Sequence, residues 1–313
     1  MSSDAEGRDP SIAGLDARQV GAFPEPASYA DGMPSVPSHG PVNSVLWFTS
    51  LREGEQGVTR RILDDLLPYL TSIGIHHQVF EVVSAGQFLA ILNALADRTG
   101  PGSIQPILHF DMHGSTENGF KIASSGETVP WDAVAARLSA VNATLGNNLF
   151  VVSCACHGQY LGPEASLTRP CPYYVLVAPK GQVSAGFLED AIVPFYEAVF
   201  GAADFVSACG SYLTPGFTLF HSERLLMHSL VKYVRRHCVG RGAAERREDL
   251  LSQAVIEGAP VRPETRQALR AGIVPDQAMV DGFVATFLMG KHPGFDIGDV
   301  MMLVRRDIDR RGR

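Results

Sequence analysis

The sequence lacks an excess of basic charge, a long apolar run and a cysteine framework. Its 26 Lys and Arg residues stand against 33 Asp and Glu, so no overall basic field favours nucleic acid. No stretch approaches the roughly 18 to 20 apolar residues that cross a bilayer. Five cysteines in 313 residues indicate a reducing compartment, where cysteines are buried, metal-bound or catalytic rather than bridged. We expect a cytoplasmic protein that binds neither nucleic acid nor membrane.

The apolar content, in contrast, is high enough for a sizeable core. Hydrophobic residues make up 45% of the chain and charged residues 19%, which is typical of a soluble globular protein. Residues 1–42 are rich in Ser, Pro, Gly and Asp and show no sustained period. This composition predicts a disordered leader, and its first residues lack the basic and apolar segments of a signal peptide.

Short apolar runs alternate with helical patterns from residue 43 to residue 222. Six runs have the length and composition of buried strands: 44–50, 76–83, 104–112, 148–155, 173–181 and 217–221. Residues 119–131 predict a small hairpin that turns at Ser125-Gly126. The alternation predicts an α/β fold with a mostly parallel sheet of about six strands and helices on both faces. Residues 223–313 are helical in pattern and predict a C-terminal extension packed on the core.

Local signals mark the ends of two predicted helices. Gly74 is a stop signal after the helical pattern of residues 58–73. Ser84 with Gln87 forms a capping-box pattern that opens a helix over residues 85–98.

Reactive side chains follow two of these predicted strands. The run "ILHFDMHG" ends in His113-Gly114, and the run "VVSCACHG" ends in Cys156, His157 and Gly158. Carboxyl ends of parallel strands lie at one edge of a sheet, so His113 and Cys156 converge if their strands are neighbours. An imidazole can accept the proton of a thiol, and glycine beside it lets a substrate carbonyl approach. The pattern predicts a cysteine nucleophile with a histidine partner.

These motifs resemble those of a known family. The segment "ACHG" (155–158) is similar to the Q-A-C-[RQG]-G signature of caspases, and "MHG" (112–114) looks like their Ser-His-Gly segment. The broader caspase-like group, which includes the bacterial CHAT peptidases, places His-Gly after one strand and a small residue with Cys after the next. The order of elements over residues 44–156 and the hairpin after His-Gly also resemble the CHAT branch. The resemblance covers roughly residues 44–222.

The resemblance implies a caspase-like cysteine endopeptidase without a cofactor. Cys156 would be the nucleophile and His113 its acid and base. The backbone N–H groups of Gly114 and Cys156 would form the oxyanion hole, and the acyl-enzyme would be a thioester. The resemblance further implies a protein or peptide substrate, an activating partner protein, and a role in bacterial stress, antiviral defence or cell death.

Two positions depart from the family pattern. Cys154 replaces the glutamine before Ala-Cys, and His157 replaces the usual arginine after the nucleophile. That glutamine helps line the caspase pocket for an acidic P1 residue, so the P1 preference here stays open. Arg52, after the first predicted strand, lies roughly where caspases place one pocket arginine. Arg52, Cys154 and His157 are therefore the candidate substrate-pocket residues.

Other interpretations of the same residues stay open. Cys154 also fits a buried, inert cysteine, and His109 fits a core histidine whose hydrogen bonds are satisfied. A metal site would draw on six residues: His109, Asp111, His113, Cys154, Cys156 and His157. Structural zinc sites use Cys-x2–4-Cys knuckles, which are absent here, so we expect no metal. Asp111 is assigned to the core or to a supporting role.

Two other functions are compatible with the sequence. One is a caspase-like interaction module without catalysis, and the other is a hydrolase that uses Cys156 on a non-peptide amide or ester. The sequence leaves the oligomeric state and the role of residues 223–313 open.

Overall fold

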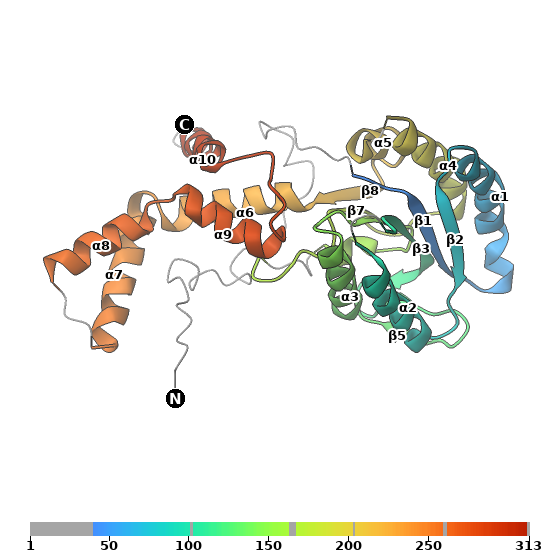
Figure 1. Cartoon of the computed structure of the whole chain (residues 1–313), viewed down its shortest axis with the longest axis horizontal. Coiled ribbons are helices and arrows are strands. Elements are labelled where there is room, and N and C mark those ends of the chain that lie inside the picture. The colour runs from blue at the N-terminus through green and yellow to red at the C-terminus, as the bar shows by residue number, and fades with distance from the viewer. Residues whose placement is uncertain (1–39, 101–102, 163–166, 203, 259–261, 312–313) are drawn as a thin grey trace.

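The computed structural model describes residues 40–100, 103–162, 167–202, 204–258 and 262–311 and shows an α/β fold around one sheet (Figure 1). Its main strands are β1 (Ser44–Ser50), β2 (His76–Glu81), β3 (Pro106–Ser115), β6 (Phe150–Ser153), β7 (Val175–Pro179) and β8 (Phe217–His221). They lie in the order β2-β1-β3-β6-β7-β8. All neighbours are parallel except β7 and β8, which are antiparallel. The predicted six-stranded, mostly parallel sheet is confirmed. The predicted leader lies outside the described residues, apart from residues 40–42.

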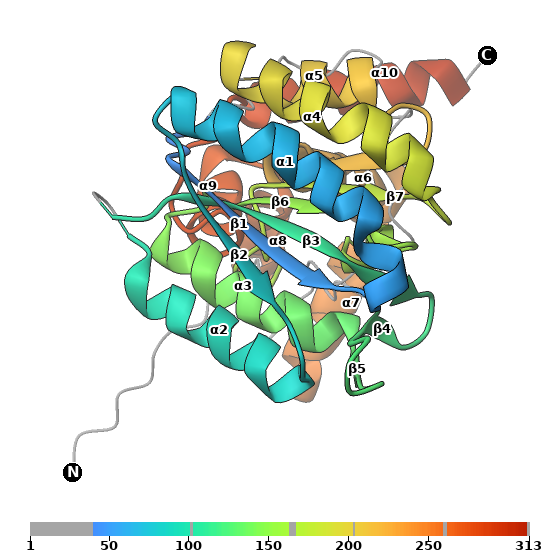
Figure 2. The ribbon, with the colours of Figure 1, turned by 90° about the vertical axis from the view of Figure 1, so that its right-hand side faces the viewer.

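Helices cover both faces of the sheet, as Figure 2 shows. Helices α1 (Gln56–Ser72), α4 (Ala185–Ala202) and α5 (Phe205–Tyr212) lie on one face, and α2 (Ala85–Arg98) and α3 (Trp131–Thr144) lie on the other. Every residue of β6 and β7 is buried, as expected for strands covered on two sides. Alternate side chains enter two apolar clusters, with Trp47 and Val152 in one and Phe48 and Phe110 in the other.

Local sequence signals set the ends of these helices. The Ser84 hydroxyl accepts a hydrogen bond from the Gln87 backbone N–H at 3.1 Å, as expected for the predicted capping box. The Gln87 side-chain oxygen accepts a hydrogen bond from the backbone N–H of Val83, one residue before the Ser84 cap, at 2.8 Å. Gly74 follows α1 with a φ of +73°, the left-handed conformation in which many helices end. Both predicted boundaries are thereby confirmed.

Strand β3 continues further than the apolar pattern predicts. Its pairing with β1 ends at Met112, but residues 113–115 continue as strand and pair antiparallel with β4 (Gly119–Lys121). Strand β4 in turn pairs with β5 (Thr128–Val129), so the predicted hairpin over residues 119–131 is confirmed. The apolar pattern stops at Met112 because His113 is the first residue beyond the covered sheet.

The order of strands reverses beside β1, because β2 lies on one side of it and β3 on the other. Ligands of open α/β sheets bind beyond the carboxyl ends of strands at such a switch point. The loop after β1 leads into the short 3-10 helix η3 (Glu53–Glu55), and the loop after β6 leads into η4 (Gly158–Leu161). The carboxyl ends of β1, β3 and β6 therefore bring residues 51–55, 113–115 and 154–158 to one edge.

The residues after β8 that the structure describes form five helices joined by loops, as the sequence predicts. They are α6 (Ser222–His237), α7 (Gly240–Ile256), α8 (Pro263–Ile273), α9 (Gln277–Phe287) and α10 (Ile297–Arg311). Helix α6 continues directly from β8 away from the sheet (Figure 1). Leu226, Phe287 and Val300, from α6, α9 and α10, join the core cluster that contains Phe110, whereas α7 buries none of its residues. Within the described residues, no helix combines the length and apolarity that a bilayer crossing requires. The division into domains near residue 222 stays a prediction.

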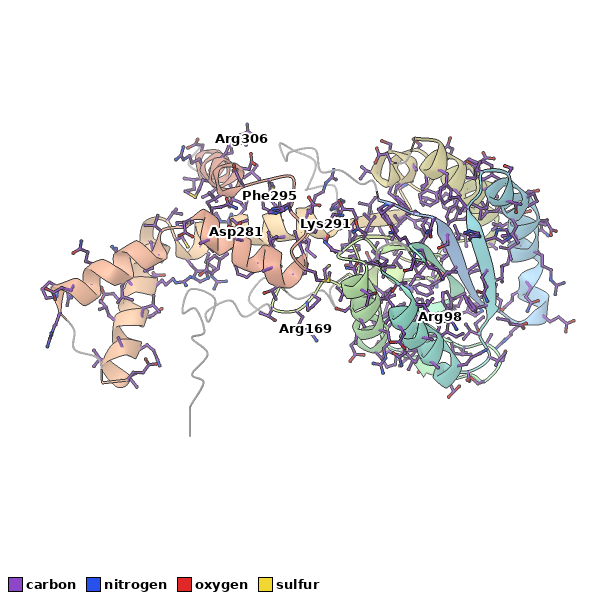
Figure 3. The ribbon with its side chains drawn as sticks, viewed as in Figure 1. Arg98, Arg169, Asp281, Lys291, Phe295 and Arg306 are labelled. Carbon is purple, nitrogen blue, oxygen red and sulfur yellow. The ribbon has the colours of Figure 1, made fainter. Side chains whose placement is uncertain are left out.

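A partly buried polar cluster joins this extension to the amino ends of β6 and β7. Lys291, in the loop between α9 and α10, donates to the Asn148 side chain at 2.8 Å and lies 3.1 Å from the centre of the Tyr174 ring. The Tyr174 hydroxyl donates to Glu223 at 3.0 Å. Burial lowers the pKa of Lys291 to about 8 and raises the pKa of Glu223. Figure 3 places Lys291 near Phe295, where the extension meets the sheet domain. The extension is thus anchored at the amino ends of these strands, whereas the switch point lies at the carboxyl ends.

Candidate active site

The register of the parallel strands places His113 and Cys156 at matching positions beyond the sheet. Phe110 of β3 pairs with Ser153 of β6, and each candidate residue lies at the same interval after its member of that pair. The backbone N–H of Cys154 donates to the carbonyl of Phe110 at 2.8 Å, which extends the contact past the end of β6. Both chains therefore leave the sheet side by side.

A backbone contact joins the two segments directly. A Cβ atom added to Gly114 would lie 2.3 Å from the carbonyl oxygen of Cys156 and 3.2 Å from the Cβ of Ala155. No real side chain tolerates the first distance, so this close approach requires glycine. His113 directly precedes Gly114, so the structure brings the histidine and cysteine segments together as the sequence predicts. Their catalytic roles stay predictions.

An acidic residue that the sequence analysis missed holds the His113 ring. Nε2 of His113 lies 2.9 Å from Oε2 of Glu55, the last residue of η3. The same oxygen accepts the backbone N–H of Arg52 at 3.0 Å. The hydrogen bond to His113 is the main cause that lowers the pKa of the Glu55 carboxyl, and the Arg52 bond is the second. The two side chains are 45% and 39% exposed, so water reaches the pair. The position of Glu55 after β1, at a switch point, is the signal that could have indicated it.

Cys156 lies half-buried in a tight turn between β6 and η4. The next residue, His157, has a φ of +61° and a ψ of 18°, a left-handed conformation that is uncommon outside glycine. Its N–H donates to the carbonyl of Gly181 at 2.9 Å, and the N–H of Gly158 donates to Ala155 at 3.0 Å. Such conformations persist where surrounding contacts hold them and often occur at functional sites. The chain thus turns sharply directly after Cys156.

A second His/Cys pair is formed by His109 of β3 and Cys154, the first residue after β6. Both side chains are buried, and the His109 ring stacks on Trp47 at a centroid distance of 3.4 Å. Nδ1 of His109 lies 2.9 Å from the Tyr196 hydroxyl. Its Nε2 is buried with no hydrogen-bond partner among the described residues, so the expected satisfied core histidine is only half satisfied. Burial lowers the pKa of His109 to about 3 and raises the pKa of Cys154 well above its usual range. At neutral pH the inner pair is uncharged and shielded from substrate.

The burial of His109 predicts a pH dependence of stability. Its folded pKa, about 3, lies below the ordinary value of 6.5, so the unfolded chain binds more protons between these two values. Its contribution to stability is complete above pH 6.5 and is lost as the pH falls toward 3. Between pH 6.5 and pH 3, we expect the free energy of unfolding of wild type to fall by up to about 1.4 kcal/mol more per pH unit than that of His109→Gln. Urea unfolding at pH 7, 6, 5 and 4 measures both slopes.

The exposed His76 on β2 provides the control for this prediction. His76→Gln should retain the wild-type slope. Equal slopes for wild type and His109→Gln would contradict the assignment of His109 as a neutral core residue.

The buried side chain of Asp111 connects β3 to α1 next to the site. Its carboxylate is buried and accepts the Thr59 hydroxyl, in the first turns of α1, at 2.6 Å. Burial raises the pKa of Asp111, and the Thr59 hydrogen bond opposes that shift. This contact ties β3 to the helix that follows Glu55. The arrangement agrees with the supporting role expected from the sequence.

The three candidate pocket residues have different environments. Arg52 is exposed in the loop before η3, and His157 is half-buried with its ring centroid 6.4 Å from that of Tyr160. Cys154 is only 5% exposed, and this burial argues against its contact with a substrate. The assignment of Arg52 and His157 to a pocket stays a prediction.

Two further features bear on ligand binding. A cavity of about 240 Å³ between α3 and residues 169–172 contains neither His113 nor Cys156 in its lining. Figure 3 labels Arg169, one of its lining residues, beside α3. In the part of the chain that the structure describes, no group of three or more His, Cys, Asp or Glu side chains is arranged to hold a metal ion.

Comparisons with known proteins add one similarity. No protein-family model matches the chain, and no curated protein matches it. Among solved structures, the chain is similar to iotapain, a secreted C11 cysteine protease from Bacteroides thetaiotaomicron, with 11% identity and a TM-score of 0.44. The similarity covers 62% of this chain and 70% of that chain. A likeness of this size does not assign the chain to a family, and the CHAT-type branch stays a prediction.

Proposed function

We propose that this chain is a caspase-like cysteine peptidase in which Cys156 attacks a peptide carbonyl and His113 transfers the protons. One observation carries the proposal. The backbone of Gly114 lies against that of Cys156, at the carboxyl ends of the neighbouring parallel strands β3 and β6. This contact supports the proposal, because ligands of open α/β sheets bind beyond the carboxyl ends of the strands.

The proposed reaction has two stages. His113 takes the thiol proton, and the sulfur of Cys156 bonds to the carbonyl carbon, with the oxyanion accepting N–H groups of Gly114 and Cys156. The C–N bond then breaks, and His113 returns the proton to the leaving amine. Water, deprotonated by His113, attacks the resulting thioester and releases the acid and the free thiol.

The states of the other cysteines support the choice of Cys156. Burial raises the pKa of Cys171 and of Cys209 to about 12 and the pKa of Cys238 to about 11. Cys154 is buried and its pKa is raised as well. A thiol attacks as its thiolate, so these four are poor nucleophiles at neutral pH. Cys156 is half-exposed and adjoins a histidine segment. Among the described residues it makes no hydrogen bond to His113, but catalytic hydrogen bonds often tighten only when substrate binds.

The finer parts of the proposal extend the sequence resemblance. The substrate is a protein or peptide, an activating partner regulates cleavage in the cytoplasm, and the context is bacterial stress, defence or cell death. A hydrolase of non-peptide amides or esters would use the same nucleophile. An interaction module would use the fold without the chemistry.

Proteome-wide profiling of new N-termini tests the peptidase directly. Cells that express wild type should gain N-termini that share a residue preference at the cleaved bond, and cells that express Cys156→Ala should not. Cys238→Ala, which removes a half-buried thiol in another part of the fold, should retain the wild-type profile. Identical profiles for wild type and Cys156→Ala would reject the peptidase. An ester substrate that still reports turnover at Cys156 would then favour the non-peptide hydrolase.

A further inference from the structure

We infer that Glu55 is a positioning residue for His113: it orients the ring toward Cys156 and stabilises the imidazolium that forms during proton transfer. The inference rests on the proposed function, because it gives Glu55 a role in the same reaction. It assigns a third side chain to a site for which the sequence motifs indicate only two.

The Glu55 carboxylate is held in place by contacts other than its hydrogen bond to the ring. Its Oε2 accepts the backbone N–H of Arg52 at 3.0 Å, and the backbone N–H of Glu55 donates to the carbonyl of Arg52 at 2.8 Å. Two hydrogen bonds thus close the same turn. The Thr59–Asp111 bond then fixes the following helix to β3. A carboxylate fixed in this way loses little conformational freedom when it binds the histidine.

The two nitrogens of the His113 ring have different environments. Nε2 of His113 lies 2.9 Å from Glu55, and a carboxylate can only accept, so the neutral ring carries its proton on Nε2. Nδ1 then presents a lone pair, and within the described residues it has no hydrogen-bond partner. A base that must take a thiol proton requires such a free nitrogen. Once Nδ1 is protonated, the positive ring lies beside the negative carboxylate.

Glu55 lies beside the switch point of the sheet. The loop after β1 and the end of β3 lie on either side of the switch point. The hydrogen bond between Glu55 and His113 therefore joins two neighbouring strands whose following strands, β2 and β6, lie on opposite sides. Three other charged groups lie near His113 in the pairing or along the chain. Lys121 pairs with it across β3 and β4, Asp111 lies two residues earlier on the same face of β3, and Arg52 lies in the loop that leads to Glu55. Of these charged neighbours and Glu55, the side chain of Glu55 is the one that bonds the ring.

The test measures how fast iodoacetamide alkylates Cys156 in the full chain from pH 5.5 to pH 9.5, with the site identified by mass spectrometry. Glu55→Gln removes the negative charge but keeps an oxygen that can accept the backbone N–H of Arg52 and the Nε2–H of His113. Glu53→Gln, in the same turn but without contact to His113, is the matched control. Glu55→Asp keeps the charge and shortens the reach to the ring.

We expect Glu55→Gln to slow alkylation about two- to fivefold near pH 6.5, the range for a partly exposed ion pair. Above pH 9 the rates should converge, because the thiol ionises without help. Glu53→Gln should be alkylated at the wild-type rate at every pH. In 1 M salt, the rate of wild type should approach that of Glu55→Gln, because screening weakens exposed ion pairs. Glu55→Asp should lie between wild type and Glu55→Gln.

Two negative results have different meanings. The role of Glu55 is wrong if Glu55→Gln is alkylated at the wild-type rate, or if it is slower by the same factor at every pH. The proposed pair of His113 and Cys156 is retained in that case, provided that the alkylation rate still depends on His113. If Cys156 of wild type reacts no faster than Cys156 of His113→Ala, the proposed function itself fails, and the inference fails with it.

Discussion

Replacement of Cys156 by alanine is expected to abolish peptide hydrolysis, and His113→Ala is expected to lower kcat/KM by about 10⁴-fold or more. The nucleophile and its base act as a unit, so the double variant should be no slower than the worse single variant. Steady-state rates on the peptide that N-terminal profiling prefers would measure these effects. Neither change should lower Tm by much, because both side chains are partly exposed.

Cys154→Ala separates the two cysteines of the motif. Cys154 is buried and its raised pKa keeps it protonated, so its removal should lower stability modestly and preserve turnover. If Cys154→Ala abolished hydrolysis at unchanged fold while Cys156→Ala remained active, the inner pair of His109 and Cys154 would be the catalytic one.

Gly114→Ala is expected to have the second largest effect. The new Cβ would lie 2.3 Å from the carbonyl oxygen of Cys156, which is backbone and cannot swing aside. Either the end of β3 or the turn at Cys156 must shift, and a displacement of about 1 Å at a reacting group costs roughly 100-fold in rate. Overpacking of this kind also destabilises the fold by about 1 to 3 kcal/mol. Steady-state kinetics and urea unfolding measure the two losses.

Gly57→Ala provides the control for this substitution. Gly57 is the second residue of α1, close to the same edge of the sheet, and an added Cβ would approach only the end of the Arg61 side chain, at 3.6 Å. This variant should retain wild-type rate and stability. A Gly114→Ala protein as active and as stable as wild type would refute the close approach of the two segments.

The sequence predicts most of the fold because the responsible signals are local. The strand at residues 44–50 and the helix at residues 85–98 have their predicted bounds. The first is an apolar run of strand length, and the second opens on a capping residue that satisfies exposed N–H groups. His113 and Cys156 are identified as candidates in the same way, because a reactive residue at the end of an apolar run is visible without knowledge of distant contacts.

The features that the sequence did not predict depend on pairing between distant segments. Glu55 gains its contact with His113 only because β3 lies next to β1. The position of Glu55 after the first strand is readable in the sequence, but the order of the strands in the sheet is not. The extension of β3 beyond Met112 depends on its pairing with β4. The burial of His109 between the Trp47 ring and Tyr196 of α4 depends on packing between the sheet and that helix. These contacts appear only once the chain is folded.

The most direct test of the account compares the alkylation of Cys156 with that of Cys238 in one sample at pH 6.5. Cys238 is the internal reference, because it is also half-buried and burial raises its pKa to about 11. We predict that Cys156 reacts much faster than Cys238 in wild type and in His109→Gln, and that His113→Ala reduces this ratio at least about tenfold. A ratio that His113→Ala leaves unchanged would contradict the claim that this histidine activates this cysteine.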